Sequence, residues 1–290
     1  MQPLCDDFFG TKPAHVTGSS SQHLNPSVRA YLDAVRAHLL EQHDAGVPSR
    51  SVNEEHAELV DRLIRKLFRL AEDRYFEAFP RLNFRLAVVA VGGYGRRELA
   101  LGSDIDLVFL FRGKENPYVE TITETIATRL WDAKLTVGAA TRTIGDSLRV
   151  GREDLSTLTS YLDGRFLIGD PALFAELDRE IRAHMREHGE AFVEARLAEQ
   201  ARRHESFGGS LYLLQPNLKE SVGGLRDYHT ALWIARATIW EVRRAEHLRV
   251  QGFIDEHEQQ QLLDALDFMW RVRNQLHRKG RKDDRLHFEA

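Results

Sequence analysis

Two aspartates two positions apart, Asp104 and Asp106, carry the clearest chemical signal in this chain of 290 residues. Side chains alternate along a β-strand, so both carboxylates face the same way if the segment is extended. Such a pair can arise by chance on a solvated strand, but an apolar run over residues 108–111 follows at once and marks a buried strand, where unpaired carboxylates are costly. Mg²⁺ takes one or two carboxylates together with substrate phosphates. The pair therefore predicts a magnesium site for nucleotidyl transfer.

A glycine turn, Gly92-Gly93-Tyr94-Gly95, stands just before the aspartates. It follows an apolar run and precedes a short helix predicted over residues 96–99, so backbone N–H groups can face an anion. We expect a triphosphate on this loop, with the Ser103 hydroxyl donating to a phosphate oxygen and Arg96 neutralising the leaving pyrophosphate. The spacing fits neither the dinucleotide fingerprint nor the P-loop, because the third glycine and the Gly-Lys-Ser/Thr run are absent.

The elements around the pair form a compact α/β unit followed by helices. Strands are predicted over 86–91, 105–111 and 135–143, and helices over 32–40, 54–79, 118–134, 171–188, 190–206, 227–244 and 255–275. Residues 10–27 lack periodicity and predict a loose N-terminal arm. We divide the chain into an N-terminal arm and helix (1–53), a nucleotidyltransferase-type unit with its preceding amphipathic helix (54–150) and a helical domain (151–290).

Composition narrows the class of protein. The 40 Lys and Arg residues against 44 Asp and Glu residues leave a formal charge of −4, which makes nucleic acid an unexpected partner. The single cysteine, Cys5, excludes an intrachain disulfide and favours a reducing compartment, which we interpret as the cytoplasm. The start of the chain lacks the pattern of a secretory signal, and its apolar runs are too short to span a membrane.

Two motifs resemble a known family. The stretch from Val91 to Leu99 with Ser103-Asp104-Ile105-Asp106-Leu107 resembles the nucleotidyltransferase signature of the bifunctional uridylyltransferase/uridylyl-removing enzymes that modify the signalling protein PII. The later run from Asn217 to Asp227 is similar to that family's second signature, in its helical domain. Residues 270–274 and 284–286 also resemble the family.

The resemblance implies an α+β fold: a polymerase-beta-like nucleotidyltransferase with a mixed sheet, followed by an all-helical domain. It implies transfer of UMP from UTP to a tyrosine hydroxyl of PII, with Mg²⁺ as cofactor and pyrophosphate as product. Sites follow by position: metal at Asp104 and Asp106; phosphates at Gly92, Gly93 and Ser103; and the nucleotide approached from the helical side by Lys219, Arg226 and Asp227.

Departures from the family leave alternatives open. A third carboxylate is common on a later strand of this fold, yet residues 135–143 contain none, and Glu98, Asp132, Asp146 or Asp227 would have to substitute. The phosphohydrolase and ACT domains of the family are also absent, so we expect a shortened chain that keeps the transferase part. An adenylyltransferase acting on another protein, and a regulatory module that binds nucleotide without turnover, remain as alternative functions.

Overall fold

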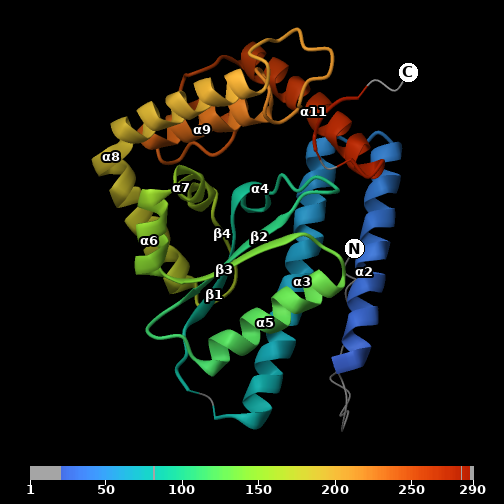
Figure 1. Ribbon diagram of the computed structural model, residues 1–290, viewed down its shortest axis with the longest axis vertical. Coiled ribbons are helices and arrows are strands. Elements are labelled where there is room, and N and C mark those ends of the chain that lie inside the picture. Colours follow the sequence, from blue (N-terminus) through green and yellow to red (C-terminus); the bar gives the residue numbers. More distant parts are fainter. Residues whose placement is uncertain (1–20, 81, 282, 288–290) are drawn as a thin grey trace.

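The computed structural model describes residues 21–80, 82–281 and 283–287, with side chains from Ser27 onward. Its elements run in chain order as α2 (Ser21–Asp44), α3 (Ser49–Ala78), β1 (Leu86–Ala90), α4 (Gly92–Gly95), β2 (Ile105–Phe111), α5 (Pro117–Asp132), β3 (Val137–Thr143), α6 (Ile144–Glu153), α7 (Leu155–Leu162), β4 (Arg165–Gly169), α8 (Pro171–Ser206), α9 (Leu225–Thr238), α10 (Ala245–Val250) and α11 (Glu256–Arg278). The α+β class is confirmed (Figure 1).

One mixed sheet organises the molecule. Its strand order is β3-β2-β1-β4; β1 is antiparallel to both β2 and β4, whereas β2 and β3 are parallel. The parallel pair is joined through α5, because parallel strands need a crossover connection. In this register Asp106 lies opposite Gly138.

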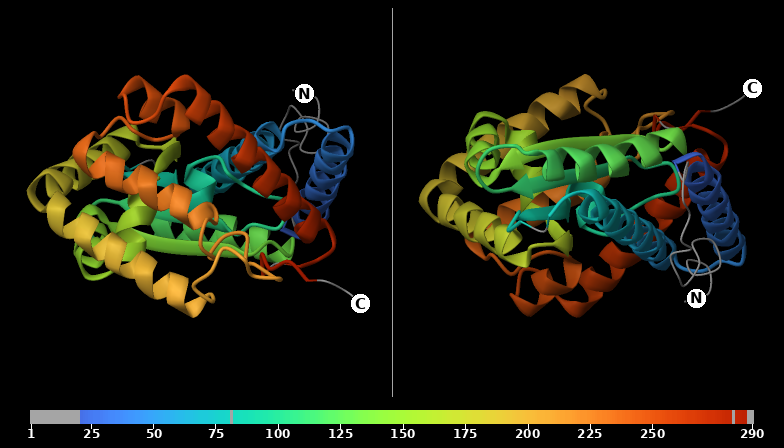
Figure 2. Two further views of the ribbon diagram at one scale, coloured as in Figure 1. Left: turned by 90° about the horizontal axis from the view of Figure 1, so that it is seen from above. Right: turned by 90° about the horizontal axis from the view of Figure 1, so that it is seen from below.

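The two faces of the sheet bury separate cores. Leu86, Val88 and Ala90 of β1 pack into a cluster with α2, α3 and α5. Their neighbours Ala87 and Val89 pack into another cluster with α7 and α8. Views from above and below show the same arrangement, with α8, α9 and α11 over one side and α3 and α5 over the other (Figure 2). This alternation is the period expected of a strand buried on both faces.

Most predicted elements are confirmed, with shifted ends. The predicted short helix over residues 96–99 is wrong, because α4 is formed by the glycines themselves. The helices predicted over 171–188 and 190–206 are one helix, α8, bent at His188, where φ is −124° and ψ is 18°. Residues 10–20 of the predicted arm lie outside the described residues, as does Cys5, and from Ser21 the chain is helical.

A fourth strand was not predicted. Residues 165–169 form β4, which pairs with β1 and completes the sheet from beyond residue 151. The part of the helical half that follows wraps back over the sheet as α8. Among the described residues no helix is both long and apolar enough to cross a bilayer.

Candidate active site

A cavity of about 340 Å³ lies between the start of β2 and the helical half. This volume is within the usual range of ligand pockets, about 300–1,000 Å³. Eight of the nine residues predicted for the site line it: Gly92, Gly93, Arg96, Ser103, Asp104, Asp106, Lys219 and Arg226. The structure therefore brings together two motifs that are more than 100 residues apart in the sequence.

The two aspartates face this cavity without a protein partner. Asp106 lies in β2 and is half-buried, and Asp104 precedes the strand and is exposed. In the described part of the chain neither side chain makes a hydrogen bond or an ion pair. Burial and the nearby charge of Asp104 raise the pKa of the Asp106 carboxyl, while Lys219 and Arg96 oppose that rise. A cation between the two carboxylates would relieve the repulsion.

The neighbouring strand leaves room for these carboxylates and adds none. A Cβ atom on Gly138 would collide with Oδ1 of Asp106, so the strand needs glycine opposite the aspartate. Among the described residues no cluster of three or more His, Cys, Asp or Glu side chains is arranged to hold a metal ion. The donor set that fits Mg²⁺ is therefore two carboxylates completed by phosphate oxygens and water.

Three other carboxylates line the cavity, and each is neutralised by its own cation or donor. Glu98 accepts from Nε of Arg96 at 2.9 Å and from His229 at 2.6 Å. Asp163 pairs with Nη1 of Arg96 and accepts the indole N–H of Trp233 at 3.1 Å. Asp284, the third, is held from α11. These pairings distinguish Asp104 and Asp106 as the unneutralised carboxylates of the cavity.

The guanidinium of Arg96 is accordingly a member of a buried network. It bridges Glu98 and Asp163, and this coupling with two carboxylates raises its pKa despite burial. The same two cationic partners, His229 and Arg96, hold the pKa of Glu98 well below its usual range. Arg96 therefore faces the cavity as part of a nearly neutral cluster, and it carries less free positive charge than the sequence suggests.

His229 is held at the base of the helical side. Its Nε2 atom is 2.6 Å from Oε2 of Glu98, and burial followed by the charge of Arg96 lowers its pKa. The adjacent indole of Trp233 has three guanidinium groups over its ring, with the nearest, Arg196, at 4.8 Å from the ring centroid. Cation–π contacts of this kind fix the indole beneath the cavity.

The glycine turn is anchored from both sides. Gly92 has φ of +58°, a conformation that favours glycine, and a Cβ on Gly95 would collide with the backbone of Asp163. Buried Tyr94 donates its hydroxyl to Asp61 of α3 at 2.6 Å. Arg165 of β4 pairs with the same carboxylate at 2.5 Å and donates to the carbonyl of Gly95 at 3.2 Å. The turn is therefore fixed by an element before it and an element after it.

The loop that carries Ser103 is held by α11. The backbone N–H of Gly102 donates to Nδ1 of His277 at 3.0 Å, and that of Leu101 donates to Asn274 at 3.1 Å. Because Nδ1 accepts, the proton of the neutral ring is on Nε2, which donates to Asp284 at 3.0 Å. The loop position thus depends on a helix about 170 residues later.

The second motif forms a tight loop around Asn217. Its side-chain oxygen accepts from the backbone N–H groups of Lys219 and Glu220 at 2.9 and 2.8 Å. Burial and the charge of Arg226 lower the pKa of the Lys219 ammonium, and its Nζ lies 3.6 Å from Glu220. This loop supplies two cations, Lys219 and Arg226, to the side of the cavity opposite the aspartates.

Asp227 does not join the other predicted residues. Its carboxylate points to α8, where it bonds to Arg203 at 2.7 Å and His204 at 2.9 Å, and it also accepts the N–H of Gly223 at 2.8 Å. These bonds lower its pKa to about 2. In this arrangement Asp227 anchors the second motif to α8, and it is not a lining residue of the cavity.

Several residues that hold the site carry no strong signal in the sequence. Asp61 and Arg165 fix the glycine turn, and Asp163 and His277 fix the arginine network and the Ser103 loop. Each is an ordinary polar residue within a helical or strand pattern, and its role depends on a partner in another element. A charged residue at a core position, as at Asp61 in the amphipathic pattern of α3, is the one local sign available.

Comparisons with known proteins agree with this site. Residues 191–290 match the family described as "GlnD PII-uridylyltransferase", and residues 33–141 match the family described as "Putative nucleotidyltransferase DUF294". The first match contains the second motif, and the other contains the glycine turn and both aspartates.

Curated relatives carry one name, "Bifunctional uridylyltransferase/uridylyl-removing enzyme". The protein from Bradyrhizobium sp. (strain ORS 278) is 40% identical over 232 residues, which cover 79% of this chain and 25% of the relative. That from Rhodopseudomonas palustris is 42% identical with the same coverage, and that from Nitrobacter hamburgensis is 38% identical over 93% of this chain and 29% of the relative. The chain therefore spans about a quarter of the length of the curated relatives it matches, and it is a homologue of the bifunctional uridylyltransferase/uridylyl-removing enzymes over that part.

Proposed function

We propose that the chain is a Mg²⁺-dependent nucleotidyltransferase that moves UMP from UTP to a tyrosine hydroxyl of a PII-type protein and releases pyrophosphate. The observation that carries this proposal is the pair of unneutralised carboxylates, Asp104 and Asp106, facing two cations across one cavity. Proteins whose names include uridylyltransferase activity, and a family named for PII, supply the nucleotide and the acceptor.

The residues divide the work as follows. Asp104 and Asp106 would hold the magnesium ion, which when bound polarises the α-phosphate and offsets the charge on the triphosphate. Gly92, Gly93 and Ser103 lie where phosphate oxygens can approach backbone N–H groups and a hydroxyl. Lys219 and Arg226 face the same space from the helical side and can neutralise the leaving pyrophosphate.

The bonds change in one displacement. The tyrosine oxygen forms a bond to the α-phosphorus, the bond between that phosphorus and the β-bridging oxygen breaks, and the tyrosine proton passes to water. The cavity positions both reactants, and positioning with electrostatic stabilisation supplies most of the rate in transfers of this class. By its cysteine content we further propose that the chain works in the cytoplasm.

The decisive experiment is a transfer assay with the purified chain, α-labelled UTP, Mg²⁺ and PII. We expect label on PII and release of pyrophosphate, both lost in Asp104→Asn/Asp106→Asn. Replacement of PII tyrosines by phenylalanine should remove the label, and excess unlabelled ATP should compete poorly. Labelling that persists in the double variant would refute the role of the aspartates.

A second function is favoured by one observation. Within the described residues no third metal-ligating side chain accompanies the two aspartates, so the chain could bind nucleotide as a regulatory module. Nucleotide binding with no release of pyrophosphate, even when PII is present, would favour this module. Preference for ATP over UTP, with another protein labelled, would instead indicate an adenylyltransferase.

A further inference from the structure

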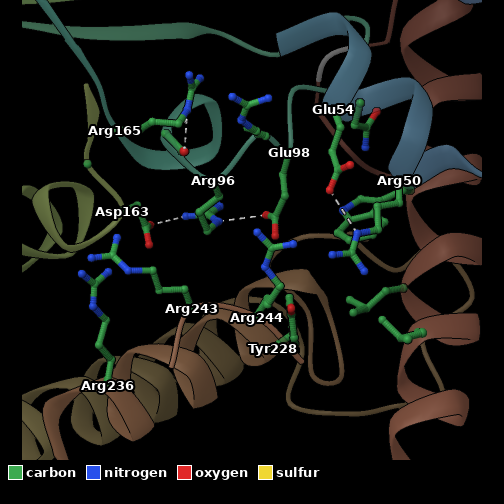
Figure 3. A pocket seen from close by; sticks show the side chains of 17 residues that line it. Arg50, Glu54, Arg96, Glu98, Asp163, Arg165, Tyr228, Arg236, Arg243 and Arg244 are labelled. Carbon is green, nitrogen blue, oxygen red and sulfur yellow. Dashed lines mark hydrogen bonds and ion pairs between the residues drawn. The ribbon is translucent and has the colours of Figure 1, made fainter. Parts of the chain in front are cut away.

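A second cavity lies on the other side of the Arg96 network. It has a volume of about 210 Å³ and shares Arg96, Glu98, Asp163 and Trp270 with the first cavity. Figure 3 shows Arg96 between Asp163 and Glu98, with Arg236 and Arg243 on one side and Arg50 on the other. The second cavity is therefore a separate space behind a common wall, outside the candidate active site.

Its lining is strongly basic. Three acidic residues, Glu54, Glu98 and Asp163, are outnumbered by seven arginines: Arg50, Arg96, Arg97, Arg165, Arg236, Arg243 and Arg244. These arginines come from α3, the glycine turn, β4, α9 and the segment before α10, so the fold gathers them from five places in the chain. Such convergence of one sign of charge in a concave space raises the local concentration of anions.

Four of these arginines are neutralised within the protein. Arg96 is bonded to two carboxylates, and Arg165 is paired with Asp61. Arg50 pairs with Glu54 at 3.2 Å and Glu246 at 2.5 Å, and Arg97 lies 3.5 Å from Glu58. The charge available to a ligand must therefore come from the remaining three, Arg236, Arg243 and Arg244.

Arg236 is the clearest of the three. Its side chain is 4% exposed, and its Nη1 donates to the carbonyl of Leu162, but its Nε and Nη2 atoms have no hydrogen-bond partner in the described structure. Asp178, the nearest carboxylate, is 4.0 Å from Nη2 and is shared with Arg243 at 3.5 Å. Burial and the charge of Arg243 lower the pKa of Arg236 to about 10. Buried donors without partners are rare, and a ligand commonly supplies the missing acceptor.

Arg244 adds a third cation. Its side chain is exposed and has no hydrogen bond or ion pair among the described residues. Guanidinium groups offer forked N–H donors that match the oxygens of phosphate groups. The volume of about 210 Å³ is below the usual range for larger ligands and favours a compact one. We propose that this second cavity binds a compact polyanion of the phosphate type, held by Arg236, Arg243 and Arg244.

A direct test is to soak crystals of the protein in sodium tungstate, a heavy tetrahedral dianion. We expect an anomalous-difference peak in the second cavity, in contact with Arg236 and with Arg243 or Arg244. A map with no peak there, or with peaks only elsewhere, would overturn the proposal. This test needs no variant and no turnover.

A solution test uses pyrophosphate without Mg²⁺, titrated at low salt and followed by calorimetry. Arg243→Gln/Arg244→Gln should weaken binding by about tenfold or more, because two of the three available cations are lost. Pyrophosphate can also enter the first cavity, but neither of these arginines lines it, so the loss reports on the second cavity.

The matched control is Arg179→Gln/Arg202→Gln. Both arginines are exposed on α8 and line neither cavity, and the net charge changes by the same amount. We expect pyrophosphate affinity within about twofold of the unmodified chain. Equal affinities in the two double variants would contradict the proposal, with circular dichroism confirming that both are folded.

Discussion

The unneutralised pair of Asp104 and Asp106 should make the metal-free protein less stable than it could be. Replacing Asp106 by Asn removes a half-buried like charge, so we expect the free energy of unfolding to rise by up to about 1 kcal/mol without Mg²⁺. The same variant should lose any further stabilisation by Mg²⁺ with UTP. Thermal unfolding with and without ligands measures both effects.

The control for this prediction is Asp73→Asn. Asp73 is an exposed aspartate of α3 and is not a lining residue of the cavity. This variant should change neither the midpoint of unfolding nor its response to Mg²⁺ and UTP. If Asp106→Asn is destabilised without ligand, the two carboxylates are not in repulsion.

His56 should make stability depend on pH in a defined window. Its Nδ1 lies 2.9 Å from the carbonyl of Leu99, and burial lowers its pKa to about 4. The unfolded state takes up a proton near pH 6.5, while the folded state resists until about pH 4, so stability is lost as pH falls through that window. We expect a loss on the order of 2 kcal/mol, and a flatter profile in His56→Gln, by urea denaturation at several pH values. Parallel profiles for the two proteins would contradict this assignment.

Single residues differ in how well the sequence predicts them. Asp104 and Asp106 were predictable, because their spacing, the apolar run after them and the glycine turn before them are all local. Asp227 belongs to an equally recognisable motif, yet its carboxylate is bonded to Arg203 and His204 on α8. A pairing across 23 or 24 residues between two helices leaves no mark in the local pattern.

At the scale of elements, α11 should control the loop that leads to the aspartates. His277→Ala removes the acceptor of the Gly102 N–H and a donor to Asp284, so buried polar groups lose their partners. We expect a loss of about 1–3 kcal/mol in the free energy of unfolding, measured by urea denaturation.

Arg278→Ala is the neighbouring control on the same helix. Its side chain is 40% exposed and pairs with Asp44, and exposed ion pairs contribute little. A change of no more than about 0.5 kcal/mol is expected. Similar losses in the two variants would mean that α11 acts through general packing and not through the His277 contacts.

Strand β4 shows why part of the fold was not predictable. Its five residues are short and partly buried without alternation, and they lie between two helical stretches. The long helix α3 was predictable, because its apolar stripe repeats over 30 residues. Pairing with β1, and not the local sequence, determines that residues 165–169 are extended.

At the scale of the whole molecule, the sheet and the helical half should unfold together. Glu98 and Asp163 bond to His229 and Trp233 of α9, and Trp233 also belongs to the core cluster on the sheet. Contacts this extensive favour a single cooperative transition, even in a chain of 290 residues.

Tryptophan positions allow this to be measured. Trp233, Trp240 and Trp270 follow β4, whereas Trp131 is exposed on α5. Urea transitions followed by tryptophan fluorescence and by far-ultraviolet circular dichroism should therefore coincide, within about 0.2 M in midpoint. A fluorescence transition that precedes the loss of ellipticity would show that the helical half opens by itself.

The pairing of β4 with β1 also has a consequence for synthesis on the ribosome. The chain emerges from its N-terminus, so β1 and β2 can pair while β4 is still inside the exit tunnel. Until residues 165–169 emerge, the outer edge of the apolar strand β1 has no partner, and bare edges of this kind invite pairing between chains. The nascent protein therefore passes through an interval in which its central strand is open to aggregation, and this interval closes only when the helical half begins to appear.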